Sequence, residues 1–184
     1  FPKKNLLRFW KFCLVVAFAF TLAGNPHRSL STLIPDSVHP WVHVPLQQSL
    51  KRGYAAKKLI TSIPADASVA AETQLVPQLA QRRVLIRFPE NYRYRDPNNL
   101  IQEVDFILSQ PKYNATYAPA FGRERRWAWA SIDRLEKLVE NNDYGVFYCD
   151  SESIVLKHKY QALEDSKTCF MREILSVKSS LPSS

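Results

Sequence analysis

The feature that most constrains this chain is an uncharged, apolar run from Phe12 to Ala23, close to its amino terminus. Basic residues precede the run, between Lys3 and Lys11, and Gly24 follows it. Uncharged apolar side chains are more stable in lipid than in water, so the run predicts a segment directed to a membrane. Because flanking cations tend to stay on the cytoplasmic side, we expect the rest of the chain on the opposite, periplasmic face.

Several interpretations of this segment compete. Residues 1–25 are interpreted as a transmembrane helix, either the last helix of a longer protein or a signal-anchor. As a cleaved signal peptide, the segment would use the small residues Thr21 and Ala23 ahead of its cleavage site. The first residue is Phe1 rather than Met, which favours the last helix of a longer protein over a signal peptide. A buried helix of a soluble protein is least favoured, because it places Arg8 and Lys11 at the edge of a core.

Residues 26–46 are expected to be a linker at the membrane interface. Pro35, Pro40 and Pro45 exclude a continuous helix, and Trp41 has the amphipathic character of an interfacial residue. Three histidines in this stretch could in principle bind a metal ion: His27, His39 and His43. The last two would share a face only on a helix, so the linker interpretation is favoured.

Residues 47–178 predict an α/β domain built as a small layer structure with a mixed sheet, and residues 179–184 a disordered tail. Helices are expected over 47–63, 73–81, 127–139 and 162–177, with Thr73 as the N-cap of the second. Strands are expected over 67–71, 83–88, 103–108, 144–149 and 153–157, the last two as a hairpin. Residues 110–124 are interpreted as a loop.

Charge and cysteine content narrow the function classes. The net charge of +8 comes from scattered clusters, which disfavours a nucleic-acid footprint, and four glycines disfavour a Gly-rich phosphate loop.

Cys149 and Cys169 either pair, as they could outside the cytoplasm, or remain two half-buried thiols. Cys13 is expected to be an inert, buried thiol. The cysteine spacing indicates no metal site, and we predict no cofactor.

Isolated polar residues of the predicted domain favour structural roles. Asp66 and Glu72 flank the first strand, too far apart for acid/base chemistry, and Asp66 suits a turn. Asp105 either faces solvent or pairs with an arginine such as Arg83. Asn114 begins a glycosylation pattern, which has meaning only in a glycosylating host. We therefore assign no catalytic residue.

The best candidate for a binding site lies at the start of the predicted helix over 127–139. Arg123, Arg125, Arg126 and Trp127 could contact a lipid or a sugar phosphate, through bidentate arginine contacts and stacking on the indole ring. The alternative is that this helix start lies on the membrane surface.

Three stretches carry a resemblance to a known family: residues 63–83, Arg87-Phe-Pro89, and Val104 to Leu108, followed by Tyr144 to Tyr148. Together they resemble the C-terminal part of the domain-of-unknown-function 2079 family, bacterial polytopic predicted membrane proteins that are common in cyanobacteria. The pattern departs at Gln78, where the family shows His, and at Ser109, where it shows Asp.

The membrane part of that family is similar to lipid-linked-sugar glycosyltransferases, whose catalytic carboxylates lie on an early outer loop. The resemblance therefore implies a last membrane helix and a C-terminal outer domain without a catalytic centre of its own. Expected partners are the lipid bilayer, upstream transmembrane helices or a larger membrane complex, and a lipid-linked sugar, but no nucleic acid. The alternatives are a membrane-tethered accessory subunit and a secreted α/β domain. Whether the whole protein is an enzyme stays open.

Overall fold

The computed structural model describes residues 3–24, 46–119 and 122–181. The chain divides into two compact units, Phe1–Lys51 and Arg52–Ser184. The predicted interface linker, with its three histidines, lies almost wholly outside the described residues. Only Leu46 of it is described, as the first residue of helix α2.

The first unit contains helix α1, Lys3–Gly24, whose apolar side chains are largely exposed, as at Leu14 and Phe20. Cys13 is half-buried rather than buried. Within the described ranges, no helix has the length and apolar content that crossing a membrane requires. The predicted transmembrane helix over residues 1–25 is corrected accordingly. The physical reason is that the uncharged run beyond Lys11 spans roughly 18 Å as a helix, against a hydrocarbon core of about 30 Å.

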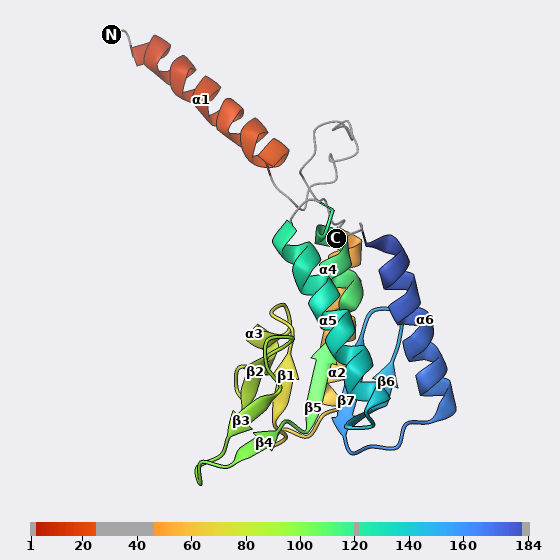
Figure 1. Ribbon diagram of the computed structural model, residues 1–184. Helices are drawn as coiled ribbons and strands as arrows, with labels where there is room; N and C mark the ends of the chain where they lie inside the picture. The colour runs from red at the N-terminus through yellow and green to blue at the C-terminus, as the bar shows by residue number, and fades with distance from the viewer. Residues whose placement is uncertain (1–2, 25–45, 120–121, 182–184) are drawn as a thin grey trace. The chain divides into compact units, whose positions relative to one another are not determined.

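The second unit is the expected α/β domain, with a five-stranded mixed sheet in the order β2-β1-β5-β7-β6 (Figure 1). Strand β1 pairs in parallel with β2 and with β5, whereas β7 is antiparallel to both β5 and β6. The sheet strands are β1 Val69–Ala71, β2 Leu85–Arg87, β5 Phe106–Ser109, β6 Tyr144–Cys149 and β7 Ile154–His158. All five lie within or next to the predicted strands, and β6 and β7 form the predicted hairpin.

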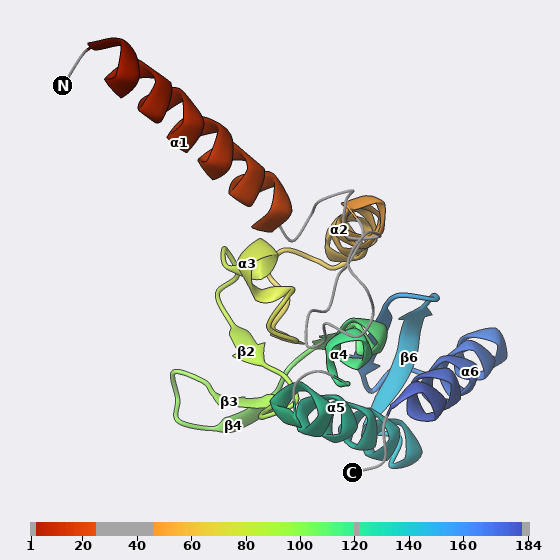
Figure 2. The ribbon, with the colours of Figure 1, turned by 90° about the horizontal axis from the view of Figure 1, so that it is seen from above.

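Helices cover both faces of this sheet, as Figure 2 shows from above. On one side, Ala70 and Ile107 contribute to a buried cluster with Ile132 and Phe170. On the other side, Leu108 lies in a second cluster with Leu59 and the residues around it. The first cluster is covered by α5 Gly122–Glu140 and α6 Glu164–Ser180, and the second by α2 Leu46–Thr61 and α3 Val76–Leu79. Because successive side chains of a strand point to opposite faces of the sheet, the strands contribute apolar side chains to a core on each face.

Three elements were not predicted, two strands and one helix. Strands β3 Arg93–Arg95 and β4 Ile101–Glu103 form a separate antiparallel hairpin. Helix α4, Pro111–Tyr117, lies inside the predicted loop over residues 110–124. Its proline occupies the first turn, where the missing N–H costs no hydrogen bond, so Pro111 starts a helix rather than excluding one.

Other boundaries differ from prediction. Helix α3 begins after Leu75 without a side-chain cap, so Thr73 is not its N-cap. Helix α6 continues through Ser180, and Leu181 is buried in the core cluster. The tail predicted from residue 179 is therefore wrong over its first three positions, and residues 182–184 lie outside the described ranges.

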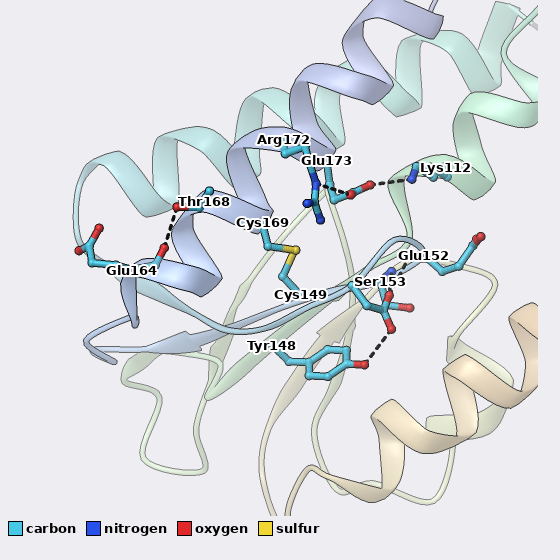
Figure 3. The surroundings of a disulfide bond; sticks show 11 residues. Lys112, Tyr148, Cys149, Glu152, Ser153, Glu164, Thr168, Cys169, Arg172 and Glu173 are labelled. Atoms are coloured by element: carbon cyan, nitrogen blue, oxygen red, sulfur yellow. Dashed lines mark hydrogen bonds and ion pairs between the residues drawn. A yellow bond between two sulfur atoms is a disulfide. The ribbon is translucent and has the colours of Figure 1, made fainter.

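A disulfide joins Cys149 of β6 to Cys169 of α6 (Figure 3), which decides the pairing that the sequence left open. The same helix is held by ion pairs, one from Lys112 of α4 to Glu173 at 2.6 Å and one from Lys178 to Glu136 of α5. Helix α6 is thus fixed to both α4 and α5 as well as to the sheet.

Candidate functional site

Glu72 follows strand β1 directly and is 0% exposed. Its carboxylate accepts four hydrogen bonds, all from neutral groups. Oε1 accepts from the hydroxyls of Ser109 at 2.7 Å and Ser131 at 2.6 Å. Oε2 accepts from the backbone N–H of Gln110 at 2.8 Å and from Nε2 of Gln74 at 2.7 Å. Such a set occupies the whole acceptor capacity of a carboxylate.

The topology explains why these groups meet. Strands β1 and β5 are parallel neighbours, so the residues after their carboxyl ends, Glu72 and Gln110, lie at one edge of the sheet. From β1 the chain continues to β2 on one side, and from β5 it continues through α4 and α5 to the strands on the other side. Ligands of open α/β sheets bind at such a point, where the connections diverge.

Burial raises the pKa of Glu72 above the ordinary value of 4.5, because the charged form loses its hydration. The hydrogen bonds from Ser131, the Gln110 amide, Ser109 and Gln74 oppose this rise, since each stabilises the carboxylate. No cation is among these partners. From the sequence, Glu72 was considered only as half of a pair with Asp66. The two lie at opposite ends of β1 and do not act together.

A cavity of about 600 Å³ opens at the same edge of the sheet, at the carboxyl ends of β1 and β2. It lies within the second unit, and Gln74 connects its wall to the buried Glu72. The lining comes from the residues after β1, the end of β2, one side of α4 and the first turns of α5: Thr73, Gln74, Arg87, Tyr113, Asn114, Tyr117, Arg123, Glu124 and Trp127.

Cationic and aromatic groups alternate around this cavity. The guanidinium of Arg87 stacks on the Trp127 ring, 4.5 Å from its centroid. The rings of Tyr113 and Tyr117, one helical turn apart on α4, have centroids 5.1 Å apart. Asn114 is 3% exposed, and within the part of the chain that the structure describes its Nδ2 has no hydrogen-bond partner.

This combination suits a ligand with a phosphate and a ring. Stacking leaves the N–H edge of the Arg87 guanidinium available for a phosphate, which would share it with the exposed carboxylate of Glu90, 3.7 Å from Nη2. The first turn of α5 adds the positive end of a helix dipole. Aromatic faces pack against sugar rings, while buried amides fix their hydroxyls.

The structure divides the predicted site residues into two groups. Arg123 and Trp127 line the cavity, whereas Arg125 and Arg126 are not among its lining residues. Arg126 is exposed and Arg125 half-buried. The sequence did not indicate Arg87 as a site residue, and the α4 residues were predicted to lie in a loop. Their signal was the Tyr113–Tyr117 spacing of one helical turn.

The remaining polar candidates have structural positions. Asp105 accepts hydrogen bonds from Ser68, through the backbone N–H at 2.8 Å and the hydroxyl at 2.7 Å, so its partner is not Arg83. This pair joins the amino ends of β1 and β5. The buried position of Asn114 keeps its glycosylation pattern inaccessible in the folded domain. Among the described residues, no group of three or more His, Cys, Asp or Glu could hold a metal ion.

The model of a family described as predicted membrane protein (DUF2079) matches residues 1–155. The chain belongs to this family. DUF2079 membership makes it a membrane protein of unknown function, and it confirms the family resemblance found in the sequence. The match ends within β7, so α6 lies beyond it. No curated protein and no solved structure matches the chain.

Proposed function

We propose that residues 52–184 form an extracytoplasmic binding domain of this membrane protein. In this proposal the cavity at the carboxyl ends of β1 and β2 binds the sugar-phosphate headgroup of a lipid-linked sugar. The domain presents or orients that headgroup in a glycosyltransferase-like system and has no catalytic centre of its own.

The observation that carries the proposal is the combination of Arg87, Arg123 and Trp127 in one cavity, whose lining also includes the two tyrosines of α4. Two guanidinium groups supply the charge for a phosphate, and the aromatic rings supply a surface for a sugar. The volume of about 600 Å³ lies within the usual range of small-molecule sites.

The disulfide between Cys149 and Cys169 supports an extracytoplasmic position. Disulfides form and persist in oxidising compartments such as the periplasm, whereas cytosolic thiols are kept reduced. The bond thus supports the proposed position of the domain on the outer face of the membrane.

Helix α1 supports contact with the bilayer. Its side chains from Phe12 to Phe20 are mostly exposed, and Phe20 reaches 75%. In a membrane protein of this family, these side chains are more stable in lipid than in water. The second unit begins at Arg52, whose guanidinium lies 5.6 Å from the ring centroid of Tyr113, a cavity residue.

Isothermal titration calorimetry of the full chain in detergent micelles with glucose 1-phosphate tests the proposal. Arg87→Met and Arg123→Met should each weaken binding at least about tenfold, because each removes a charge-assisted hydrogen bond. Arg95→Met is the matched control, since Arg95 lies on the β3–β4 hairpin and bonds to Asn99. Equal weakening by all three variants, or no binding by the native chain, contradicts the proposal.

One observation favours the accessory subunit as a second candidate. Met171 and Leu175, one turn apart on α6, are 53% and 59% exposed. They form an apolar strip that could pack on a larger membrane complex. Met171→Lys with Leu175→Lys should then remove this chain from its complex in mild detergent extracts while leaving glucose 1-phosphate binding intact. An unchanged complex size rules this candidate out.

A further inference from the structure

Within the described ranges, Gln74 is the one polar residue of the cavity lining whose side chain is hydrogen-bonded directly to the buried carboxylate of Glu72. Its Nε2 donates to Glu72 Oε2 at 2.7 Å. The same residue lines the cavity. Gln74 therefore links the buried carboxylate of Glu72 to the cavity surface that a ligand would contact.

The hydrogen bonds of Glu72 fix which end of the Gln74 amide faces the carboxylate. Both oxygens of Glu72 accept from groups that surround it, and Oε2 already accepts from the Gln110 N–H, which cannot act as an acceptor. Gln74 must therefore present its NH₂ group to Glu72. Because the amide nitrogen and oxygen share one carbon, Oε1 of Gln74 is turned away from Glu72, and Gln74 is one of the residues that line the cavity.

Asn114 supplies a donor to the same cavity. It is 3% exposed, and no partner for its Nδ2 occurs in the described part of the chain. A buried donor without a partner destabilises the folded domain, and a ligand acceptor removes that cost. The cavity wall thus holds one fixed acceptor, Gln74, and one vacant donor, Asn114, in addition to its arginines.

We infer that Gln74 Oε1 and Asn114 Nδ2 recognise a sugar hydroxyl beside the phosphate, and that Glu72 is the positioning residue that fixes Gln74. This inference rests on the proposed function and specifies its ligand as a phosphate ester that bears ring hydroxyls. A hydroxyl can donate to Gln74 and accept from Asn114, whereas a simple alkyl phosphate satisfies neither. Selectivity then comes from the pair of amides, and charge attraction comes from the arginines.

The test compares the affinities of the full chain in micelles for glucose 1-phosphate and methyl phosphate, measured by calorimetry. The native chain should prefer glucose 1-phosphate by about tenfold or more, the worth of one or two hydrogen bonds. Gln74→Leu and Glu72→Met should abolish this preference and leave the affinity for methyl phosphate unchanged. A merely structural role of Glu72 would weaken both ligands together.

Glu72→Gln is the matched control. Its amide oxygen can take the place of Oε2 and accept from Gln110 and Gln74, while its NH₂ faces the hydroxyls of Ser109 and Ser131. This variant should keep the native preference. If Glu72→Met does not fold, Gln74→Leu carries the test, because Gln74 is only partly buried.

The outcomes separate this inference from the proposed function. Equal affinity of the native chain for both phosphates, or a preference that survives Gln74→Leu, overturns the inference but leaves phosphate binding in place. Absence of binding to either phosphate overturns the proposed function itself.

Discussion

Replacing Glu72 by leucine should lower the unfolding free energy of the domain by about 3 kcal/mol. The main cause is the Gln110 N–H, which is buried and has Glu72 Oε2 as its acceptor. Leaving such a donor unsatisfied costs about 1–3 kcal/mol. The hydroxyls of Ser109 and Ser131 lose their acceptor as well, but they lie 3.5 Å apart and can partly bond to each other. Their loss therefore adds only about 1 kcal/mol.

Replacing Glu72 by glutamine should change the unfolding free energy by less than about 1 kcal/mol, since an amide can satisfy all four partners. Urea denaturation of the full chain in micelles, followed by tryptophan fluorescence, measures both variants. For a domain of this size, a loss of 3 kcal/mol corresponds to a fall of about 10 °C in the thermal midpoint. Leucine and glutamine variants of equal stability would refute the reasoning that the carboxylate satisfies these donors.

The pH dependence supplies a second measurement on the same pair. The folded-state pKa of Glu72 is raised, so the folded domain binds this proton more tightly than the unfolded chain does. The contribution of Glu72 to stability is therefore fully present below about pH 4.5, and it is lost as pH rises through the raised pKa. The native chain should lose stability relative to Glu72→Gln over that interval. If the difference in unfolding free energy between the native chain and Glu72→Gln stays constant with pH, the pKa of Glu72 is not raised.

Two further perturbations have matched controls. Gly145→Ala should destabilise the domain by about 2–3 kcal/mol, because the added Cβ would overlap the Tyr160 carbonyl oxygen. Gly53→Ala, in open space on α2, should instead gain up to about 1 kcal/mol; urea midpoints measure both, and equal effects would contradict the packing around Gly145. Cys169→Ser should cost about 3 kcal/mol through loss of a cross-link over 20 residues, and make stability insensitive to dithiothreitol. Cys13→Ser should retain that sensitivity, and an insensitive native chain would show that the disulfide does not form.

The sequence predicted the sheet well because its strands are dense in apolar, β-branched residues. The run Val104 to Leu108 and the hairpin from Tyr144 onwards stand between turn residues, and each strand begins and ends within three positions of its predicted bounds. Helix α5 was predicted from its apolar stripe, which includes Ile132 and Leu135. These signals are local, so a single sequence contains them.

The parts that were missed depend on context that local patterns do not contain. Pro111 favours a loop and a helix start about equally, and its place in α4 depends on packing against α5. The β3–β4 hairpin has short, polar strands, which resemble a loop. For α1, the apolar character of the sequence suggested a transmembrane helix, but its uncharged run is too short to cross a membrane.

The same limit explains the site. Arg123 and Trp127 were found because arginine beside tryptophan is a local motif. The burial of Glu72 depends on Ser131, 59 positions further along the chain, and on the parallel pairing of β1 with β5. No local pattern around Glu72 indicates that its carboxylate is buried. Arg87 joins the cavity through the pairing of β1 with β2, and Tyr113 follows β5, which pairs with β1 on its other side.

A crystal structure of the chain with glucose 1-phosphate tests the central claim most directly. We expect a phosphate between Arg87 and Arg123, a sugar ring against Trp127, and a ring hydroxyl between the amides of Gln74 and Asn114. A ligand bound elsewhere on the domain, or a cavity filled only by water at saturating ligand, would contradict it.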